Sequence, residues 1–269
     1  MESVVQRSRP VPTDKLAADV VVENVSLVYE STSGGRLRAL DRVSFEVPRR
    51  HFVGIVGPSG CGKSSLLLML AGLLCPTSGR ILVRDKELTK PEPTEIGVVF
   101  QEASLLPWKT ALENVEFPLK LRNIPKGERR ARALELLELV GLKDFKDRLP
   151  HELSGGMRQR VSIARGFSQD PHVLLMDEPF AALDEQTRLT MGDELLRIWT
   201  QRQKTVIFVT HSLTEAVYLC DEVLVMSSRP GRIIDRVEIP LARPRTYEMM
   251  ATETFGRLRE RIWRSIRAN

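Results

Sequence analysis

The stretch Gly57-Pro58-Ser59-Gly60-Cys61-Gly62-Lys63-Ser64 decides the fold of this 269-residue chain. It matches the pattern G-x-x-x-x-G-K-[ST], in which glycines let successive backbone N–H groups face one phosphate group. The short, mostly apolar run at 51–56 predicts a strand before it, and the apolar stretch at 64–75 predicts a buried helix after it. A strand, a glycine loop and a helix N-terminus in this order form a phosphate-binding site.

The pattern also assigns roles to single residues of this loop. Lys63 is placed to reach the β- and γ-phosphates of a nucleotide, and the Ser64 hydroxyl is placed to ligate Mg²⁺. An accidental glycine turn before Lys-Ser would have neither role, but the strand and helix around the loop favour the functional interpretation. The predicted nucleotide-binding residues are Gly57, Pro58, Ser59, Gly60, Cys61, Gly62, Lys63, Ser64 and Ser65.

A second apolar strand is predicted at 173–176, and two carboxylates follow it directly. Asp177 is expected near the metal, directly or through water, which leaves Glu178 free to polarise an attacking water. An acidic pair before Pro179 is also an ordinary helix start. The functional interpretation therefore depends on the presence of the phosphate loop.

The segment Leu153-Ser154-Gly155-Gly156-Met157-Arg158-Gln159-Arg160 stands before a predicted helix. Ser154 is a suitable N-cap, and the two glycines leave backbone N–H groups accessible. An ordinary Ser-Gly-Gly helix start would look the same. On a chain that already has a phosphate loop, however, the segment resembles the LSGGQ signature of the ATP-binding-cassette (ABC) ATPases.

This resemblance implies a fold and an assembly. The fold is α/β, a P-loop NTPase with a RecA-like core, an N-terminal antiparallel β subdomain and an inserted α-helical subdomain. The assembly is a head-to-tail homodimer that encloses two ATP molecules with Mg²⁺, because the signature of one family member covers the nucleotide held by its partner. The residues implied to act in trans are Ser154, Gly155, Gly156 and Gln159.

Four further residues follow in the order of the family. Tyr29 resembles the aromatic that stacks on adenine, and Gln101 resembles the Q-loop glutamine that senses Mg²⁺ and the attacking water. Asp184, in Ala182-Leu183-Asp184, resembles the D-loop residue near the dimer seam, and His211 resembles the switch histidine that contacts the γ-phosphate. Singly, each has an ordinary alternative: a strand aromatic, a loop glutamine, a helix N-cap or a structural histidine. The implied catalytic set is Glu178, His211 and Gln101, and the implied metal set is Ser64, Gln101 and Asp177.

Composition shifts along the chain predict three segments. Residues 1–18 are a polar lead-in, residues 19–240 hold the ATPase domain with a helical subdomain at about 102–170, and residues 241–269 are a basic helical tail. In the tail, Phe255, Leu258, Ile262 and Ile266 form one helical stripe, which predicts docking to the core or to a second copy rather than a membrane anchor.

The β-branched runs at 20–29 and 39–47 are predicted to pair antiparallel across a turn at 31–35. The alternation of strands and helices after residue 170 predicts a largely parallel sheet with helices on both faces.

Charge and composition exclude other classes of protein. The net charge is +5, and residues 241–269 hold seven arginines against three glutamates, so the rest of the chain carries only about +1 and has no nucleic-acid footprint. The longest apolar run, at 66–75, is too short to span a bilayer, and the N-terminus has no apolar signal-peptide core. Cys61, Cys75 and Cys220 lack metal-ligand spacing and fit a reducing compartment.

Without a membrane span, the work of hydrolysis has to reach a separate permease. Met157-Arg158-Gln159-Arg160 in the signature and Ser212 after His211 depart from the common pattern of the family. Together with Ser104-Leu105-Leu106-Pro107-Trp108, Asp184-Glu185-Gln186-Thr187-Arg188 and Arg229-Pro230-Gly231-Arg232-Ile233, they resemble the nitrate/sulfonate/taurine branch of importers. This resemblance implies a peripheral subunit on the cytoplasmic face of the inner membrane, which acts with permease subunits and a solute-binding protein. Leu105 to Trp108 are the candidate permease contact.

Three other classes of phosphate-loop protein are alternatives, and a feature of the sequence argues against each. A soluble ABC ATPase of DNA repair carries a long coiled-coil insertion between phosphate loop and signature, and here only the stretch 64–154 separates them, without sustained heptads. A translation-associated ABC protein carries two cassettes in one chain. A phosphate-loop kinase or GTPase has no use for the Ser-Gly-Gly signature and His211.

Overall fold

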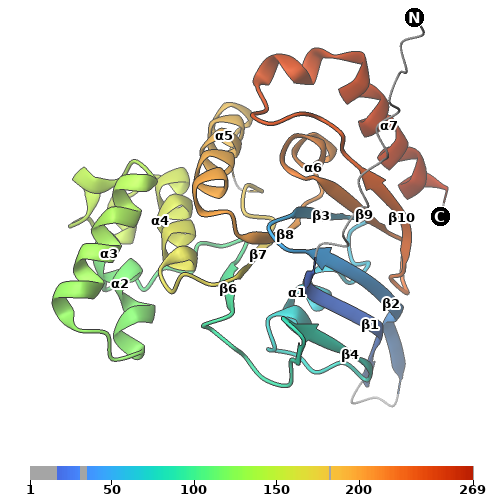
Figure 1. The fold of residues 1–269 in the computed structure, drawn as a ribbon, viewed down its shortest axis with the longest axis horizontal. Helices are drawn as coiled ribbons and strands as arrows, with labels where there is room; N and C mark the ends of the chain where they lie inside the picture. The colour runs from blue at the N-terminus through green and yellow to red at the C-terminus, as the bar shows by residue number, and fades with distance from the viewer. Residues whose placement is uncertain (1–16, 31–34, 182, 269) are drawn as a thin grey trace, which may run out of the picture.

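The structure of the chain is a computed structural model that describes residues 17–30, 35–181 and 183–268 (Figure 1). Most of the predicted lead-in at 1–18 lies outside these ranges. The predicted turn at 31–35 lies outside them except for Gly35, and so does Ala182 of the predicted D-loop segment.

The N-terminal sheet has the strand order β2–β1–β4–β5 and is antiparallel throughout. Its central strand β1 (Ala18–Glu30) pairs with β2 (Arg36–Pro48), as the two β-branched runs predict. The other strands are β4 (Ser78–Val83) and β5 (Lys86–Glu87). Alternate side chains of β1, including Val20 and Val22, are buried, so this sheet presents one apolar face to the rest of the molecule.

The second sheet has the strand order β10–β9–β3–β8–β7–β6. Five of its strands run parallel: β9 (Glu222–Met226), β3 (Phe52–Val56), β8 (Thr205–Val209), β7 (Val173–Asp177) and β6 (Ile96–Val99). The edge strand β10 (Ile233–Glu238) pairs antiparallel with β9 and is not predicted by the sequence. Three of its six residues are charged and only Val237 is fully buried, so it lacks the apolar run that marks a central strand.

Helices cover both faces of the parallel sheet, as predicted (Figure 1). α1 (Lys63–Leu70) lies between the two sheets and packs against β7 and β8. The opposite face is covered by α5 (Glu185–Arg202) and α6 (Leu213–Leu219). Two apolar cores result, one on each face of the parallel sheet. They hold the sheet between them, and the phosphate loop follows the carboxyl end of its strand β3.

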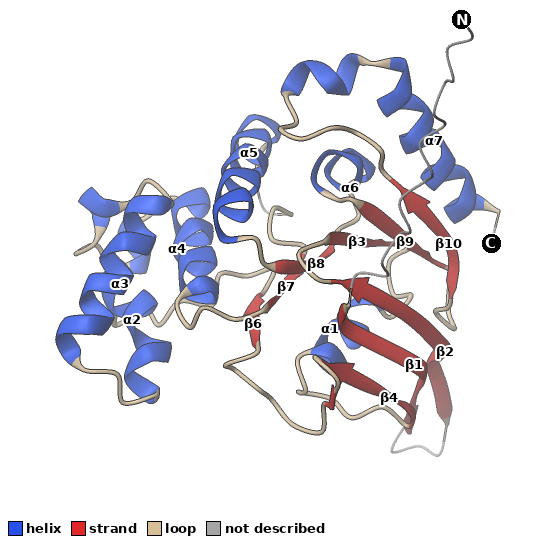
Figure 2. Ribbon diagram, viewed as in Figure 1, coloured by secondary structure: helices blue, strands red, loops and turns tan. Residues whose placement is uncertain are grey.

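The predicted helical subdomain consists of three helices that pack on one another beside the parallel sheet (Figure 2). They are α2 (Ala111–Leu121), α3 (Lys126–Leu139) and α4 (Gly155–Phe167). α2 begins with a capping box formed by Thr110 and Glu113, and α4 contacts β6. Short 3₁₀ turns occupy 143–145 and 150–152 between α3 and α4. α4, which carries the predicted signature, is thereby joined to the parallel sheet through β6.

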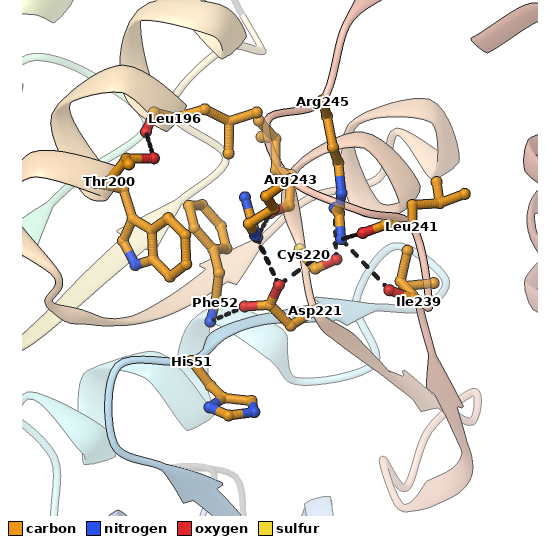
Figure 3. A network of polar contacts seen from close by, with 12 residues as sticks. His51, Phe52, Leu196, Thr200, Cys220, Asp221, Ile239, Leu241, Arg243 and Arg245 are labelled. Carbon is orange, nitrogen blue, oxygen red and sulfur yellow. Dashed lines mark hydrogen bonds and ion pairs between the residues drawn. The ribbon is translucent and has the colours of Figure 1, made fainter. Parts of the chain in front are cut away.

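The tail after residue 240 is fastened to the parallel sheet by buried polar contacts (Figure 3). The guanidinium of Arg245 donates to backbone carbonyl oxygens around it, of which that of Cys220 is the nearest at 2.7 Å. Asp221 accepts hydrogen bonds from the backbone N–H of Phe52, at 2.9 Å, and from Arg243. Arg243 also lies over the ring of Trp199, with 4.1 Å between the guanidinium carbon and the ring centroid.

A 3₁₀ turn at Tyr247–Ala251 and helix α7 (Glu253–Arg267) complete the chain. Phe255 and Ile262 are buried in the core, and Leu258 and Ile266 pack against it. The apolar stripe of the tail therefore docks on its own chain, one of the two outcomes that the sequence predicts. Within the described residues, no helix combines the length and the apolar character needed to cross a bilayer.

Candidate functional site

A cavity of about 270 Å³ opens at the carboxyl end of β3. The phosphate loop forms its floor, while Tyr29 of β1, Leu37 and Ala39 of β2, and Glu178 after β7 line its walls. The hydroxyl groups of Tyr29 and Ser65 lie 3.0 Å apart, and the Tyr29 side chain is partly exposed. The structure thus brings the predicted stacking residue to the mouth of the predicted phosphate site.

The loop has its shape because of the glycine that precedes α1. Gly62 has φ +104°, and a Cβ atom built there would lie 2.7 Å from the side chain of Leu40. Only glycine satisfies both the left-handed backbone and this close approach. Its neighbour Cys61 is buried, and burial raises the pKa of its thiol, so Cys61 is a packing residue of the loop rather than a reactive group.

Backbone carbonyl oxygens of the phosphate loop hold the Lys63 ammonium in place. Nζ donates to the carbonyl oxygens of Gly57 at 2.9 Å and Pro58 at 3.0 Å, and the side chain is only 7% exposed. A cation fixed at the N-terminus of α1 reinforces the positive field of that helix end. The site is therefore complementary to phosphate oxygens.

Asp177 and Ser64 fit a Mg²⁺ ion. Asp177 Oδ1 is buried without a hydrogen-bond partner, and burial raises the pKa of this carboxyl against the lowering effects of a Ser64 hydrogen bond and of Lys63. An orphaned carboxylate oxygen next to a serine hydroxyl is a suitable pair of oxygen ligands. The described residues contain no cluster of three His, Cys, Asp or Glu side chains, and Mg²⁺ at a phosphate site needs none, because nucleotide oxygens and waters complete its shell.

Glu178 and His211 form a contact at the edge of the cavity. Glu178 Oε2 lies 2.8 Å from His211 Nδ1, and the Glu178 backbone N–H donates to the carbonyl of Val209. Glu178 has φ +43°, an uncommon conformation for a residue with a side chain and one that concentrates at functional sites. The two residues that the sequence assigns to water activation and to the γ-phosphate are therefore paired.

The signature residues and Gln101 are not brought into this cavity. Gln101 lines a separate groove of about 600 Å³ together with Gly155 and Gln159. Ser154 caps α4 by accepting a hydrogen bond from the N–H of Met157 at 3.3 Å. Gln159 is buried and donates to the carbonyl of Phe100 at 3.4 Å, so it ties α4 to the residue that directly follows β6.

Asp184 is the N-cap of α5 in this structure. Its Oδ1 accepts from the N–H of Thr187 at 3.0 Å, and these contacts with Thr187 lower the pKa of its carboxyl. Asp184 can be both a helix N-cap and the D-loop residue at the dimer seam. The cap fixes the backbone around Asp184, and this segment lies at the surface.

Three contacts of the site region are not predicted by the sequence, although the segment of Arg229 is noted there for its resemblance to the importer branch. Arg229 donates to the carbonyl of Gly60 in the phosphate loop at 2.9 Å. Asn114 is fully buried and bonds both backbone groups of Leu106, and Arg165 donates to carbonyl oxygens at 103 and 104. Arg165 and Arg229 reach loops that are far away in the sequence, and Asn114 reaches one eight residues before it. No spacing pattern in the sequence predicts these contacts.

The parallel sheet, phosphate loop and paired acidic and histidine side chains define a P-loop ATPase of the cassette type. Residues 40–181 match the model of the ABC transporter family. The chain belongs to this family, as one of its ATP-binding and ATP-hydrolysing subunits. The match confirms the resemblance on which the sequence analysis depends.

Individual relatives and solved structures agree. The taurine import ATP-binding protein TauB of Rhizobium johnstonii is 47% identical over 90% of this chain and 94% of its own length. The bicarbonate transport ATP-binding protein CmpD of Synechocystis sp. is 42% identical over 94% of this chain and 92% of its own. A cassette solved as a dimer in a post-hydrolysis state with ADP and phosphate aligns with a TM-score of 0.74 and 32% identity over 83% of this chain and 100% of that one. The predicted fold class is thereby confirmed.

Proposed function

We propose that this chain is the ATP-hydrolysing subunit of an importer for a small solute of the nitrate, sulfonate or taurine kind. It acts as a head-to-tail homodimer on the cytoplasmic face of the membrane, with separate permease subunits and a solute-binding protein. Relatives named for taurine and for bicarbonate support import, and they differ in solute at comparable identity. Similarity in this subunit therefore does not identify the solute, and we assign its selection to the other subunits.

The observation that carries this proposal is the separation of the signature from the nucleotide cavity. Neither Ser154 nor the two glycines after it line the cavity at Lys63. A Cβ atom built on Gly155 would meet nothing closer than 3.9 Å, so packing within the chain does not require glycine there, whereas one built on Gly156 would lie 3.2 Å from the Thr187 side chain. The glycine at 155 therefore supports the close approach of a group from outside the chain, for which we propose a nucleotide bound to a second copy.

The geometry supports one division of labour in hydrolysis. Lys63 and the loop N–H groups orient the phosphates, and Ser64 and Asp177 hold Mg²⁺, which neutralises developing charge on the phosphate oxygens when it is bound. Glu178 is then the carboxylate left to position a water, while His211 fixes its orientation through the 2.8 Å contact. Gln101 lies in the neighbouring groove, outside the cavity at Lys63, so its implied role at Mg²⁺ and the attacking water requires that it approach this centre in the nucleotide-bound dimer.

The loop between β6 and α2 is built to present an aromatic side chain. Asn114 bonds the backbone of Leu106 and the carbonyl of Lys109, which holds the loop from inside. Trp108, between these anchors, is 72% exposed. A large aromatic on a rigid loop is the anchor type that dominates interface energies, which favours the docking role over packing beneath the helices.

Replacing Trp108 by Ala is expected to weaken permease association by about 2 kcal/mol or more, roughly 30-fold in affinity, because interface aromatics carry such energies. The basal ATPase rate and the melting temperature of the isolated chain should stay nearly unchanged, since the side chain is exposed. Tyr247→Ala is the matched control, because Tyr247 is also exposed but lies in the C-terminal 3₁₀ turn. An equal loss of association in both variants would refute the docking role.

The proposed function is tested by reconstituting the chain in vesicles with a permease and a solute-binding protein of its proposed transporter. ATP hydrolysis should rise when the cognate solute and its binding protein are added, and solute should accumulate in the vesicles. Stimulation by DNA or by ribosomes instead would support a soluble ABC ATPase of repair or translation and overturn the importer assignment.

A further inference from the structure

Two charged residues outside the nucleotide cavity connect the loop of Asp184 to the loop of His211. Arg188 lies in the first turn of α5, four residues after the N-cap Asp184. Glu215 lies in the first turn of α6, after the N-cap Ser212. The sequence links the segment of Arg188 only to the importer branch and assigns the residue no role, and Glu215 belongs to none of the predicted motifs. Neither residue lines the cavity at Lys63.

Arg188 holds the backbone before α5. Its Nη2 donates to the carbonyl oxygen of Leu183 at 2.9 Å, in the segment next to Asp184. Its Nε lies 3.4 Å from Glu215 Oε1 and is buried without a hydrogen bond of its own. One guanidinium therefore contacts two elements, the D-loop segment and α6.

Glu215 holds the backbone around His211. Its Oε2 accepts a hydrogen bond from the Thr210 hydroxyl at 2.5 Å, and the same hydroxyl oxygen accepts from the N–H of Ser212 at 3.0 Å. Thr210 bonds the Glu215 carboxylate directly, and Ser212 is tied to it through the Thr210 hydroxyl. The connection therefore runs from Leu183 through Arg188 and Glu215 to Thr210, along the backbone to His211, and from there to the Glu178 carboxylate.

The energetics favour a positioning role for this pair over a stabilising one. The Arg188 and Glu215 side chains are 28% and 12% exposed, and burial raises the pKa of the Glu215 carboxyl. A buried ion pair adds little net stability compared with apolar side chains of similar volume, because desolvation offsets the attraction. What such an ion pair contributes is a defined arrangement of the groups that it contacts. The Arg188–Glu215 pair contacts the loop that carries His211.

We propose that Arg188 and Glu215 are positioning residues for hydrolysis, which hold His211 against Glu178 and make this contact depend on the position of the Leu183–Asp184 segment. The inference rests on the proposed function in one respect, that Asp184 lies at the seam with a second copy. A contact of the second copy with Asp184 would then act on the Leu183–Asp184 segment, and the Arg188 and Glu215 contacts would connect this segment to His211 and Glu178.

The test is steady-state ATP turnover by the full chain with Mg-ATP. Arg188→Met and Glu215→Gln should each lower kcat about tenfold or more and leave KM for ATP within about twofold, because neither residue touches the nucleotide cavity. Glu215→Gln keeps an acceptor oxygen for Thr210 and nearly the same side-chain volume, so this variant is expected to fold. The double variant should be no slower than the slower single variant, because both changes break one connection.

Arg197→Met is the matched control. Arg197 lies on the same helix, pairs with Glu194 at 2.6 Å and donates to a backbone carbonyl of another element, that of Leu139. It lies away from the two loops, so its loss should leave kcat within about twofold.

Imidazole NMR signals give a readout that a purely structural role would not move. The chain has four histidines, and the signals of His211 are assigned by their loss in His211→Asn. These signals should shift in Arg188→Met and stay in place in Arg197→Met. Parental kcat with unshifted His211 signals, or rate losses that multiply in the double variant, would overturn the proposal. A parental chain without ATP turnover would instead refute the proposed function.

Discussion

Replacing Glu178 by Gln is expected to slow ATP hydrolysis on the order of 10²–10⁴-fold, the range that general-base catalysis contributes. Asp177 Oδ1 is buried without a hydrogen-bond partner and is assigned to Mg²⁺, so we expect another group to take the proton from water. Glu178 is 20% exposed, faces the cavity and contacts His211, which places its carboxylate where the water is expected. Gln keeps the volume and the hydrogen-bonding capacity but removes the base.

The same substitution should preserve or strengthen ATP binding. It removes one negative charge from the lining of a cavity that takes phosphates, so repulsion falls while the Lys63 and loop contacts stay in place. The variant should therefore accumulate as an ATP-bound dimer. Size-exclusion chromatography with Mg-ATP, together with a phosphate-release assay, measures both effects.

Glu185→Gln is a suitable control for Glu178→Gln. It removes the same charge from an exposed residue in the first turn of α5, and it should hydrolyse ATP near the parental rate. If Glu178→Gln also turns over at the parental rate, or stays monomeric when its ATP site is filled, another group orients the water.

The parts of the site that the sequence predicts are those whose chemistry is local. Eight consecutive residues form the phosphate loop, and Asp177 and Glu178 follow directly on an apolar strand. In a parallel sheet the carboxyl ends of neighbouring strands meet at one edge, so the order of β3, β7 and β8 brings these residues and His211 together. Their proximity follows from the topology without any knowledge of side-chain packing.

The contacts that support the site are not local and leave no pattern in the sequence. Arg229 lies 169 residues from the Gly60 carbonyl that it bonds, and Asn114 looks like any polar residue in a helical stretch until its burial is known. The edge strand β10 is missed for a related reason, since its charged residues lack the periodicity of a buried strand. Such features depend on which segments meet in space, which spacing along one chain does not determine.

Replacing Lys63 by Ala is expected to weaken ATP binding by about 3 kcal/mol or more, roughly 10²-fold in Kd, and to abolish measurable turnover. Hydrogen bonds to charged groups contribute about 1.5–3 kcal/mol each, and the ammonium is placed to make more than one of them to the phosphates. Its position is fixed by the carbonyl oxygens of Gly57 and Pro58, so little rearrangement is needed when phosphates bind. Isothermal titration with Mg-ATP measures the loss.

Stability has to be separated from binding in this experiment, because Lys63 is 7% exposed and bonds its own loop. Ala leaves a small void and two carbonyl oxygens without this donor, whereas Lys63→Met keeps the aliphatic volume and removes only the charge. Both variants should lose ATP binding to a similar extent, while Lys63→Met should melt closer to the parental chain. A folded Lys63→Met protein that binds ATP with parental affinity would show that the phosphates are held by the backbone N–H groups and the helix end alone, and the ammonium would then be a structural brace of the loop.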